Sequence, residues 1–168
     1  MVTIFNNLQL QLTTTRLAHQ LLEEIEHLDD LVVIGLQPRG IYISNAIMAE
    51  VKKLTPEKIH YGKLDITFYR DDFRTELHSA NQTDIPFSIE NKKVVLIDDV
   101  LYTGRTIRAA LDALLDFGRP KNVKLCVLVN RRFDREFPIQ PDYYGIAIDS
   151  MISQKVKVDA AIGEVILY

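Results

Sequence analysis

The sequence is poor in the features that mark secreted and membrane proteins. It has one cysteine, Cys126, so no internal disulfide bond can form, which indicates a reducing compartment. Uncharged stretches such as Ile41–Ala49 are short, and none approaches the ~20 apolar residues that a membrane span needs. Residues 1–15 contain no lysine, no arginine and no long apolar core, which excludes a secretory signal. We therefore expect a soluble, cytoplasmic protein.

The chain also lacks an excess of either charge and several common binding motifs. It carries 20 Lys and Arg against 23 Asp and Glu, a formal net charge of −3, which disfavours binding of nucleic acid through bulk charge. The histidines show no metal-ligand spacing, which argues against a zinc site. Gly35 and Gly40 have the spacing of a Walker loop, but Ile41-Tyr42 follow where Lys and Ser/Thr are required. A P-loop nucleotide site is therefore excluded.

What the sequence does contain is an alternation of apolar strands and amphipathic helices. Hydrophobic residues make up 47% of the chain, so we expect one folded domain over residues 1–168. The strands predicted from apolar runs are 31–34, 59–69, 94–97, 123–129, 143–148, 155–158 and 165–167. The helices predicted from apolar spacing are 16–28, after a threonine cap at 13–15, then 41–53, and one from about Thr106 to Gly118. The alternation predicts an α/β fold, with a central parallel sheet flanked by helices on both faces.

One strand ends in a pattern that is typical of an anion site. Two carboxylates, Asp98 and Asp99, follow the apolar run 94–97, and the polar loop 103–106 then opens a helix. The first turn of a helix offers unpaired N–H groups and a positive dipole end, so phosphate is its natural occupant. Carboxylates accept hydrogen bonds from sugar hydroxyls or hold a hydrated cation. The end of a strand would explain the carboxylates alone, and the cap of a helix would explain the polar loop alone. The two features together indicate a site for a ribose 5-phosphate.

The stretch 94–106 resembles the phosphoribosyl pyrophosphate (PRPP) signature of type I phosphoribosyltransferases. Further segments are similar to the PyrR family, whose members are uracil phosphoribosyltransferases, some of which also regulate pyrimidine operons by binding RNA. The segments that carry this similarity are 15–19, 35–42, 65–72 and 98–114. The similarity covers most of the chain and thins after Arg131. It implies the type I phosphoribosyltransferase fold, with a flexible loop in the polar segment after Tyr69 and a small hood.

The resemblance also implies which residues bind PRPP. Those expected at its ribose-5-phosphate part are Asp98, Asp99, Tyr102, Thr103, Gly104, Arg105 and Thr106. Those expected at its pyrophosphate are Arg39, Gly40 and Arg70, with Arg74 of the flexible loop as a further candidate. Mg²⁺ is the implied cofactor, held by Asp98 and Asp99 only indirectly, through PRPP or water. Asp98, Asp99 and Arg39 are the expected catalytic residues, because the carboxylates stabilise positive charge on the ribose and Arg39 stabilises the departing pyrophosphate.

The nucleobase is expected beside Asn130, Arg131 and Phe133, where Phe133 or Tyr102 stacks on a pyrimidine. The usual family text here is Asp-Arg-Gly-His-Arg-Glu-Leu-Pro. This chain has Asn130 for the acid, Arg132 for the glycine, Phe133 for the histidine and one extra residue, Asp134. The implied function is uracil phosphoribosyltransferase in pyrimidine salvage, which forms UMP and pyrophosphate. A phosphoribosyltransferase for another nucleobase, such as a purine, stays open.

Charge is unevenly distributed along the chain. Residues 119–135 hold six Lys and Arg against one Asp, whereas residues 1–30 hold one Arg against five acidic residues. A basic patch of this kind can meet RNA phosphates. Relatives that bind RNA keep a basic stretch after this point, but 143–149 has none. The alternative function is therefore RNA-binding regulation of pyrimidine operon attenuation, with or without the enzyme activity. A homo-oligomer, a dimer or larger, is implied by the resemblance alone.

Overall fold

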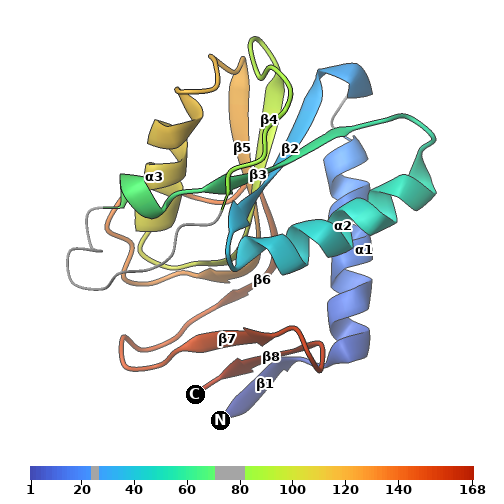
Figure 1. The fold of residues 1–168 in the computed structure, drawn as a ribbon. Coiled ribbons are helices and arrows are strands. Elements are labelled where there is room, and N and C mark those ends of the chain that lie inside the picture. The colour runs from blue at the N-terminus through green and yellow to red at the C-terminus, as the bar shows by residue number, and fades with distance from the viewer. Residues whose placement is uncertain (24–26, 71–81) are drawn as a thin grey trace.

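A five-stranded parallel sheet forms the centre of the structure (Figure 1). The computed structural model describes residues 1–23, 27–70 and 82–168. The strands, in the order β3-β2-β4-β5-β6, are β2 (Leu31–Gln37), β3 (His60–Asp65), β4 (Lys93–Leu101), β5 (Asn122–Arg131) and β6 (Tyr143–Ile148). Each pair of neighbours is parallel. The predicted α/β fold is thus confirmed.

Helices cover both faces of this sheet (Figure 1). α1 (Asn7–Glu23) and α2 (Gly40–Leu54) pack on one face, where Leu17 and Ile43 are fully buried. α3 (Arg105–Leu114) packs on the other face, in a second apolar cluster. A parallel sheet that is covered on both sides buries strands along their whole length. This explains why the strand signals in the sequence are continuous apolar runs.

Helix α1 begins earlier than the sequence predicts. The threonines at 13–15 were expected to cap it, but they lie inside a helix that starts at Asn7. The cap is Asn6, whose side-chain oxygen accepts the Gln9 N–H, while the Gln9 side chain accepts the Asn6 N–H, each at 2.9 Å. Two N–H groups are satisfied reciprocally, as in a capping box. The prediction was wrong because the Asn6 and Gln9 side chains, rather than a threonine hydroxyl, cap the helix.

Two strand boundaries also differ from the prediction. β3 ends at Asp65, because the Asp65 side chain accepts hydrogen bonds from the N–H and hydroxyl of Thr67, at 2.9 and 2.6 Å, and starts the 3₁₀ turn η2 (Thr67–Tyr69). β4 continues to Leu101, so the acidic pair lies inside the strand rather than after it. Another 3₁₀ turn, η1 (Leu28–Asp30), leads into β2. The predicted flexible loop, with Arg74, falls in residues 71–81, outside the described residues.

A smaller sheet forms the predicted hood beyond the carboxyl ends of the central strands (Figure 1). It is antiparallel, in the order β1-β8-β7, and joins β1 (Val2–Phe5) to β7 (Val156–Asp159) and β8 (Glu164–Leu167). β1 was not predicted, because four residues carry too little pattern and its partner β8 lies at the other end of the chain. The first and last segments of the chain therefore build the hood together.

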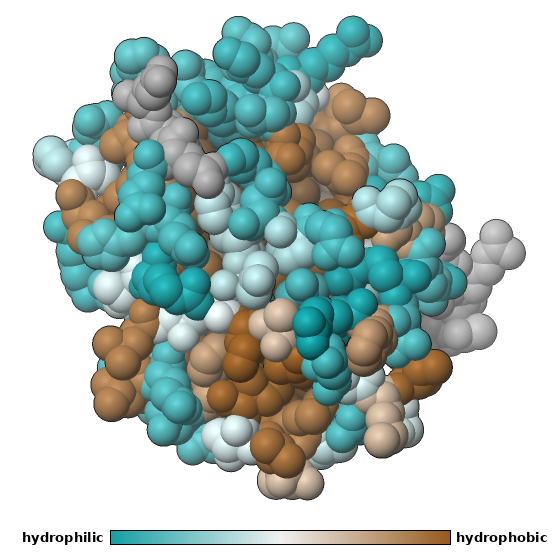
Figure 2. Space-filling model, turned by 180° about the vertical axis from the view of Figure 1, so that it is seen from behind, coloured by the Kyte–Doolittle hydropathy of each residue, from teal (hydrophilic) through white to brown (hydrophobic). Residues whose placement is uncertain are grey.

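Apolar side chains are exposed at the hood end of the molecule. Figure 2 shows hydrophobic surface over the lower part of the molecule, the part in which Figure 1 places the hood. Val2, Leu8, Leu12 and Ile162 belong to this end and are between 58% and 63% exposed. The Asn7 side chain donates a hydrogen bond to the Ile162 carbonyl, which ties the β7–β8 turn to the start of α1. Within the described residues, no helix is long and apolar enough to cross a membrane.

Candidate substrate site at the carboxyl ends of the sheet

The residues predicted to bind PRPP meet where β2 and β4 end. These strands are parallel neighbours, so the segments that follow them meet at one edge of the sheet. Gly40 lies directly on β4: a Cβ there would be 2.5 Å from the Ile97 carbonyl oxygen and 3.0 Å from the Asp98 Cα. Only glycine allows this approach. We call residues 37–40 the pyrophosphate loop, and its Gln37–Pro38 peptide is cis.

The acidic pair is buried beside this loop. Asp98 and Asp99 are 5% and 8% exposed. One oxygen of Asp98 accepts the Asp99 N–H at 2.9 Å, and one oxygen of Asp99 accepts the Val100 N–H at 2.7 Å. Burial, and then the charge of Asp99, raises the pKa of Asp98 well above its ordinary value. Burial also raises the pKa of Asp99, and the Arg39 guanidinium opposes both shifts. The pair therefore suits a partner that donates hydrogen bonds or carries positive charge.

The turn between β4 and α3 has the geometry of a phosphate loop, and we use that name for residues 102–106. Gly104 has φ +93°, a left-handed conformation that favours glycine, and it is the N-cap of α3. The Thr103 hydroxyl accepts the Arg105 N–H at 3.4 Å. The Thr103 carbonyl accepts the N–H groups of Glu136 and Phe137, at 2.9 and 3.3 Å, from the segment after β5. The loop is therefore held by that segment at the start of a helix, where an anion is stabilised.

The two predicted pyrophosphate arginines lie on different sides of the site. Arg39 lies near enough to the acidic pair to affect both carboxyls. The Arg70 guanidinium instead donates to the Thr106 hydroxyl at 3.4 Å, at the phosphate loop. The preceding residue, Tyr69, donates its hydroxyl proton to Asp116 beyond the end of α3. The chain is thus anchored to the α3 side immediately before residue 71.

The predicted base-pocket residues are only partly brought together. Asn130 is buried at the end of β5, next to Leu101 of β4. Arg131 is also buried, with its guanidinium 3.7 Å from the centre of the Tyr102 ring. It donates hydrogen bonds to the Ser150 hydroxyl at 2.8 Å and the Met151 carbonyl at 3.0 Å. Phe133, by contrast, is 57% exposed. Arg131 therefore contacts both the Tyr102 ring and the segment after β6, whereas Phe133 lies largely in solvent.

Sequence reasoning missed a pair of residues that hold the phosphate loop. Arg135 donates to the Tyr102 carbonyl, and Glu136 accepts a hydrogen bond from Arg105 Nε at 2.6 Å. These contacts join positions more than 30 apart in sequence, at separations of 33 and 31 residues, and no local pattern encodes them. The signal that was available is the Arg-Glu of the family text, which this chain keeps although the residues before it differ.

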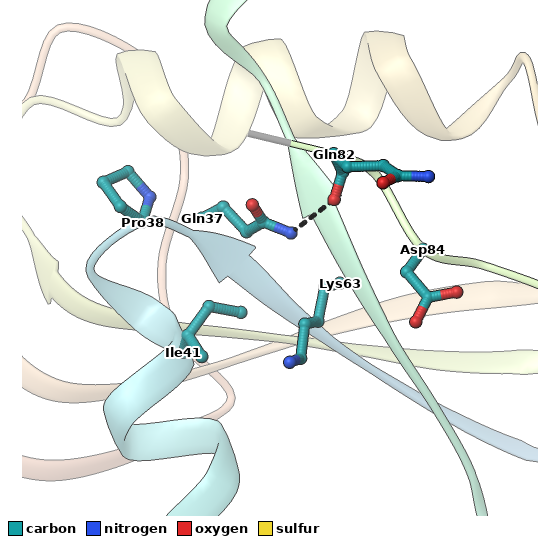
Figure 3. Close-up of a pocket in the computed structure, with 6 residues that line it drawn as sticks. All are labelled: Gln37, Pro38, Ile41, Lys63, Gln82 and Asp84. Atoms are coloured by element: carbon teal, nitrogen blue, oxygen red, sulfur yellow. Dashed lines mark hydrogen bonds between the residues drawn. The ribbon is translucent and has the colours of Figure 1, made fainter. Parts of the chain in front are cut away.

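A hollow of about 620 Å³ lies between the pyrophosphate loop and β3 (Figure 3). Its lining residues are Gln37, Pro38, Ile41, Lys63, Gln82 and Asp84. The Gln37 side chain donates to the Gln82 carbonyl at 2.9 Å, the dashed line in Figure 3. Lys63 and Asp84 exchange two backbone hydrogen bonds of 2.8 Å. The segment that contains Gln82 and Asp84 is therefore tied both to β3 and to the pyrophosphate loop.

Comparison with known proteins identifies the class. Residues 3–161 match the family of the phosphoribosyl transferase domain. The fold is also that of a hypoxanthine-guanine phosphoribosyltransferase from Bacillus anthracis (TM-score 0.70, 20% identity, 88% of this chain and 82% of that one). A hypoxanthine phosphoribosyltransferase from Staphylococcus aureus gives a TM-score of 0.70 at 19% identity, over 90% and 80% of the two chains. The fold and the family match define a type I phosphoribosyltransferase.

More similar relatives narrow the family. The bifunctional protein PyrR of Halalkalibacterium halodurans is 44% identical over 156 residues, which are 90% of this chain and 85% of the relative. The PyrR of Elusimicrobium minutum is 49% identical over 139 residues, 82% and 77% of the two chains. The chain belongs to the PyrR family.

Proposed function

We propose that the chain transfers the phosphoribosyl group of PRPP to uracil, forming UMP and pyrophosphate for pyrimidine salvage in the cytoplasm. The observation that carries this proposal is the buried acidic pair, Asp98 and Asp99, between two glycine-dependent loops. A loop at a helix start suits the 5-phosphate, carboxylates suit the ribose hydroxyls, and Gly40 brings a backbone close enough for the pyrophosphate. The three features match the three parts of PRPP, and membership of the PyrR family supports uracil as the base.

The arrangement supports a dissociative transfer without a covalent nucleophile. The bond from the anomeric carbon to pyrophosphate breaks ahead of bond formation to the uracil nitrogen, so positive charge develops on the ribose. The uracil N–H proton is released to solvent as the new bond forms. Asp98 and Asp99 stabilise this charge, and Arg39 stabilises the leaving group. Mg²⁺ supplies further charge compensation when bound with PRPP. Within the described residues no group of three or more His, Cys, Asp or Glu side chains could hold a metal ion, so the pair fits Mg²⁺ indirectly, through PRPP or water. Orientation of the substrates contributes much of the rate.

Initial rates with a panel of bases test this proposal. The chain is incubated with PRPP, Mg²⁺ and uracil, cytosine, hypoxanthine or guanine, and nucleotide and pyrophosphate are measured. We expect equal amounts of UMP and pyrophosphate with uracil and the lowest kcat/KM with the purines. Product with a purine alone would contradict uracil as the substrate but not the transferase chemistry, and no product with any base would contradict both.

RNA-binding regulation is the second candidate function, because the relatives are described as bifunctional. The basic run 119–135 offers less free charge than its sequence suggests: Arg131 is buried, and Arg132 makes two hydrogen bonds to Asp149, of 2.6 and 2.5 Å. A gel shift with the pyrimidine operon leader RNA, with and without UMP at physiological salt, tests this role. A UMP-dependent shift supports it, and the absence of any shift removes it.

We also propose that the chain forms a homo-oligomer through the exposed apolar residues of the hood end. Leu8 and Leu12 lie one helical turn apart on α1 and are 63% and 62% exposed. Exposed apolar patches mark protein contact surfaces. Leu8→Glu with Leu12→Glu is expected to shift the molar mass from oligomer to monomer in size-exclusion chromatography with light scattering. Leu111→Glu with Leu115→Glu, a second pair of exposed leucines four residues apart at the end of α3, is the matched control. An unchanged mass in the leucine variant would show that contact lies elsewhere.

A further inference from the structure

Arg135 joins the two halves of the proposed substrate site. It follows β5, and its guanidinium donates to the carbonyl of Tyr102 in the phosphate loop. The same group donates to the Asn130 side-chain oxygen at 2.8 Å and to the Arg131 carbonyl at 3.1 Å. A guanidinium is planar and its donors point in fixed directions. The positions of these acceptors therefore depend on one another.

On the phosphate side, Arg135 contacts the backbone that precedes Thr103. The next residue, Glu136, donates its backbone N–H to the Thr103 carbonyl at 2.9 Å, so residues 135 and 136 contact residues 102 and 103 in turn. A Cβ at Gly104 would lie 3.7 Å from the Arg135 Cδ, so the side chain also packs along the loop. The backbone that leads into the phosphate loop is thus held by the Arg135 side chain at Tyr102 and by the Glu136 N–H at Thr103.

On the base side, Arg135 determines how the Asn130 amide is turned. A guanidinium only donates, so the Asn130 atom that faces it is the carbonyl oxygen, and the amide nitrogen faces the other way. Within the described residues no hydrogen bond uses that nitrogen. Asn130 is 6% exposed, and its amide nitrogen is not among the buried atoms that lack a partner, so this nitrogen stays accessible from outside. An N–H donor there suits a carbonyl oxygen, such as those of uracil.

The surroundings of Arg135 are unusual for an arginine with a purely structural role. The acceptors named above are two carbonyls and an amide, all neutral, and its Nε is buried without a partner among the described residues. Burial lowers its pKa. A buried donor without a partner reduces stability, and the neutral acceptors named above give Arg135 no ion pair that would offset this loss.

We propose that Arg135 is a positioning residue that couples base recognition to PRPP binding, because one guanidinium sets both the phosphate-loop backbone and the Asn130 amide. This inference rests on the proposed function, since it assumes that a base and a phosphoribosyl group occupy the two sides. It gives Arg135 a role distinct from that of the substrate-contacting residues.

Arg135→Lys tests the coupling, with Arg132→Lys as a matched control in the same segment. Lysine keeps the charge but cannot reach three acceptors in one plane. We expect KM for PRPP and KM for uracil each to rise about tenfold, with kcat changed less than about threefold. The contacts that are lost hold the bound substrates and the transition state equally, so binding weakens while the rate of the bound complex is kept. Arg135→Ala removes the guanidinium entirely, so it should raise both KM values as well. Millimolar guanidinium added to the assay is expected to lower these KM values again. Arg132→Lys should behave as wild type.

The outcomes separate this inference from the proposed function. With an active wild type, unchanged KM values in Arg135→Lys, or a rise in only one of them, would overturn the coupling. Failure of both Arg135 variants to fold would do so too, because the residue would then be structural. If the wild type forms no nucleotide, the proposed function fails, and calorimetric UMP binding decides: about tenfold weaker binding in Arg135→Lys supports the coupling, and equal binding contradicts it.

Discussion

Asp99→Asn is expected to lower kcat with PRPP about 100- to 1,000-fold, the effect typical of removing one preorganised electrostatic group. The amide keeps the size of the side chain and can still accept the Val100 N–H. It loses the negative charge that faces the ribose as positive charge develops there. Steady-state kinetics with varied PRPP measure this effect. Thr103→Val is the companion change on the phosphate side, and it is expected to raise KM for PRPP rather than to lower kcat.

Asp99→Asn is expected to keep or gain stability at neutral pH. Burial raises the pKa of Asp99 in the folded protein, whereas the unfolded carboxyl titrates near its usual value of about 3.9. As pH rises from about 3.9 toward the folded pKa, the unfolded state releases its proton first. The carboxyl therefore lowers the free energy of unfolding, and this loss is complete above the folded pKa. The neutral amide of the variant carries no such cost. The Tm difference between variant and wild type should therefore be more positive at pH 7 than at pH 4.

Kinetics and melting together decide the role of Asp99. Lost activity with an unchanged or higher Tm identifies a functional carboxylate. Unchanged kcat and KM in both Asp99→Asn and Thr103→Val would contradict the site. A large fall in Tm at pH 7 would show that Asp99 stabilises the fold.

Gly40→Ala is expected to raise KM for PRPP at least about tenfold and to destabilise the fold by about 1–3 kcal/mol. The added Cβ would lie 2.5 Å from the Ile97 carbonyl oxygen, so the pyrophosphate loop must move away from the acidic pair. That movement separates groups that must meet one substrate. Steady-state kinetics and urea unfolding measure the two effects.

Gly145→Ala is the matched control for this change. A Cβ at Gly145 would also lie 2.5 Å from a backbone oxygen, that of Leu128, but in the middle of β6 rather than at the site. It is expected to cost similar stability and leave KM for PRPP unchanged in the folded fraction. An equal rise in KM for both variants would show that Gly40 acts only through stability.

The central fold was predictable because its signals are local and strong. The apolar runs at 31–34 and 94–97 are buried on both faces, and such strands need no partner pattern to be recognised. β1 lacked this advantage, since it exists only by pairing with β8. The start of α1 was misjudged because the side chains of Asn6 and Gln9, rather than a threonine, satisfy its first N–H groups.

The candidate site could be proposed from its motifs, but its internal contacts could not be predicted. The spacing of Asp98, Asp99 and Gly104 follows from one stretch of chain, and in the structure the two carboxyls are buried and Gly104 has a left-handed conformation. Arg131 was expected at the base, but Ser150 and Met151 hold its guanidinium, and those residues follow a different strand. Contacts of this kind depend on which strands become neighbours, which a local pattern does not encode.

A crystal structure of the chain with UMP tests the central claim most directly. We predict the 5-phosphate at the start of α3, on Thr103 to Thr106, the ribose hydroxyls on Asp98 and Asp99, and the uracil beside Asn130. A nucleotide with its phosphate anywhere else, or with its ribose away from the acidic pair, would contradict the claim that this edge of the sheet is the substrate site.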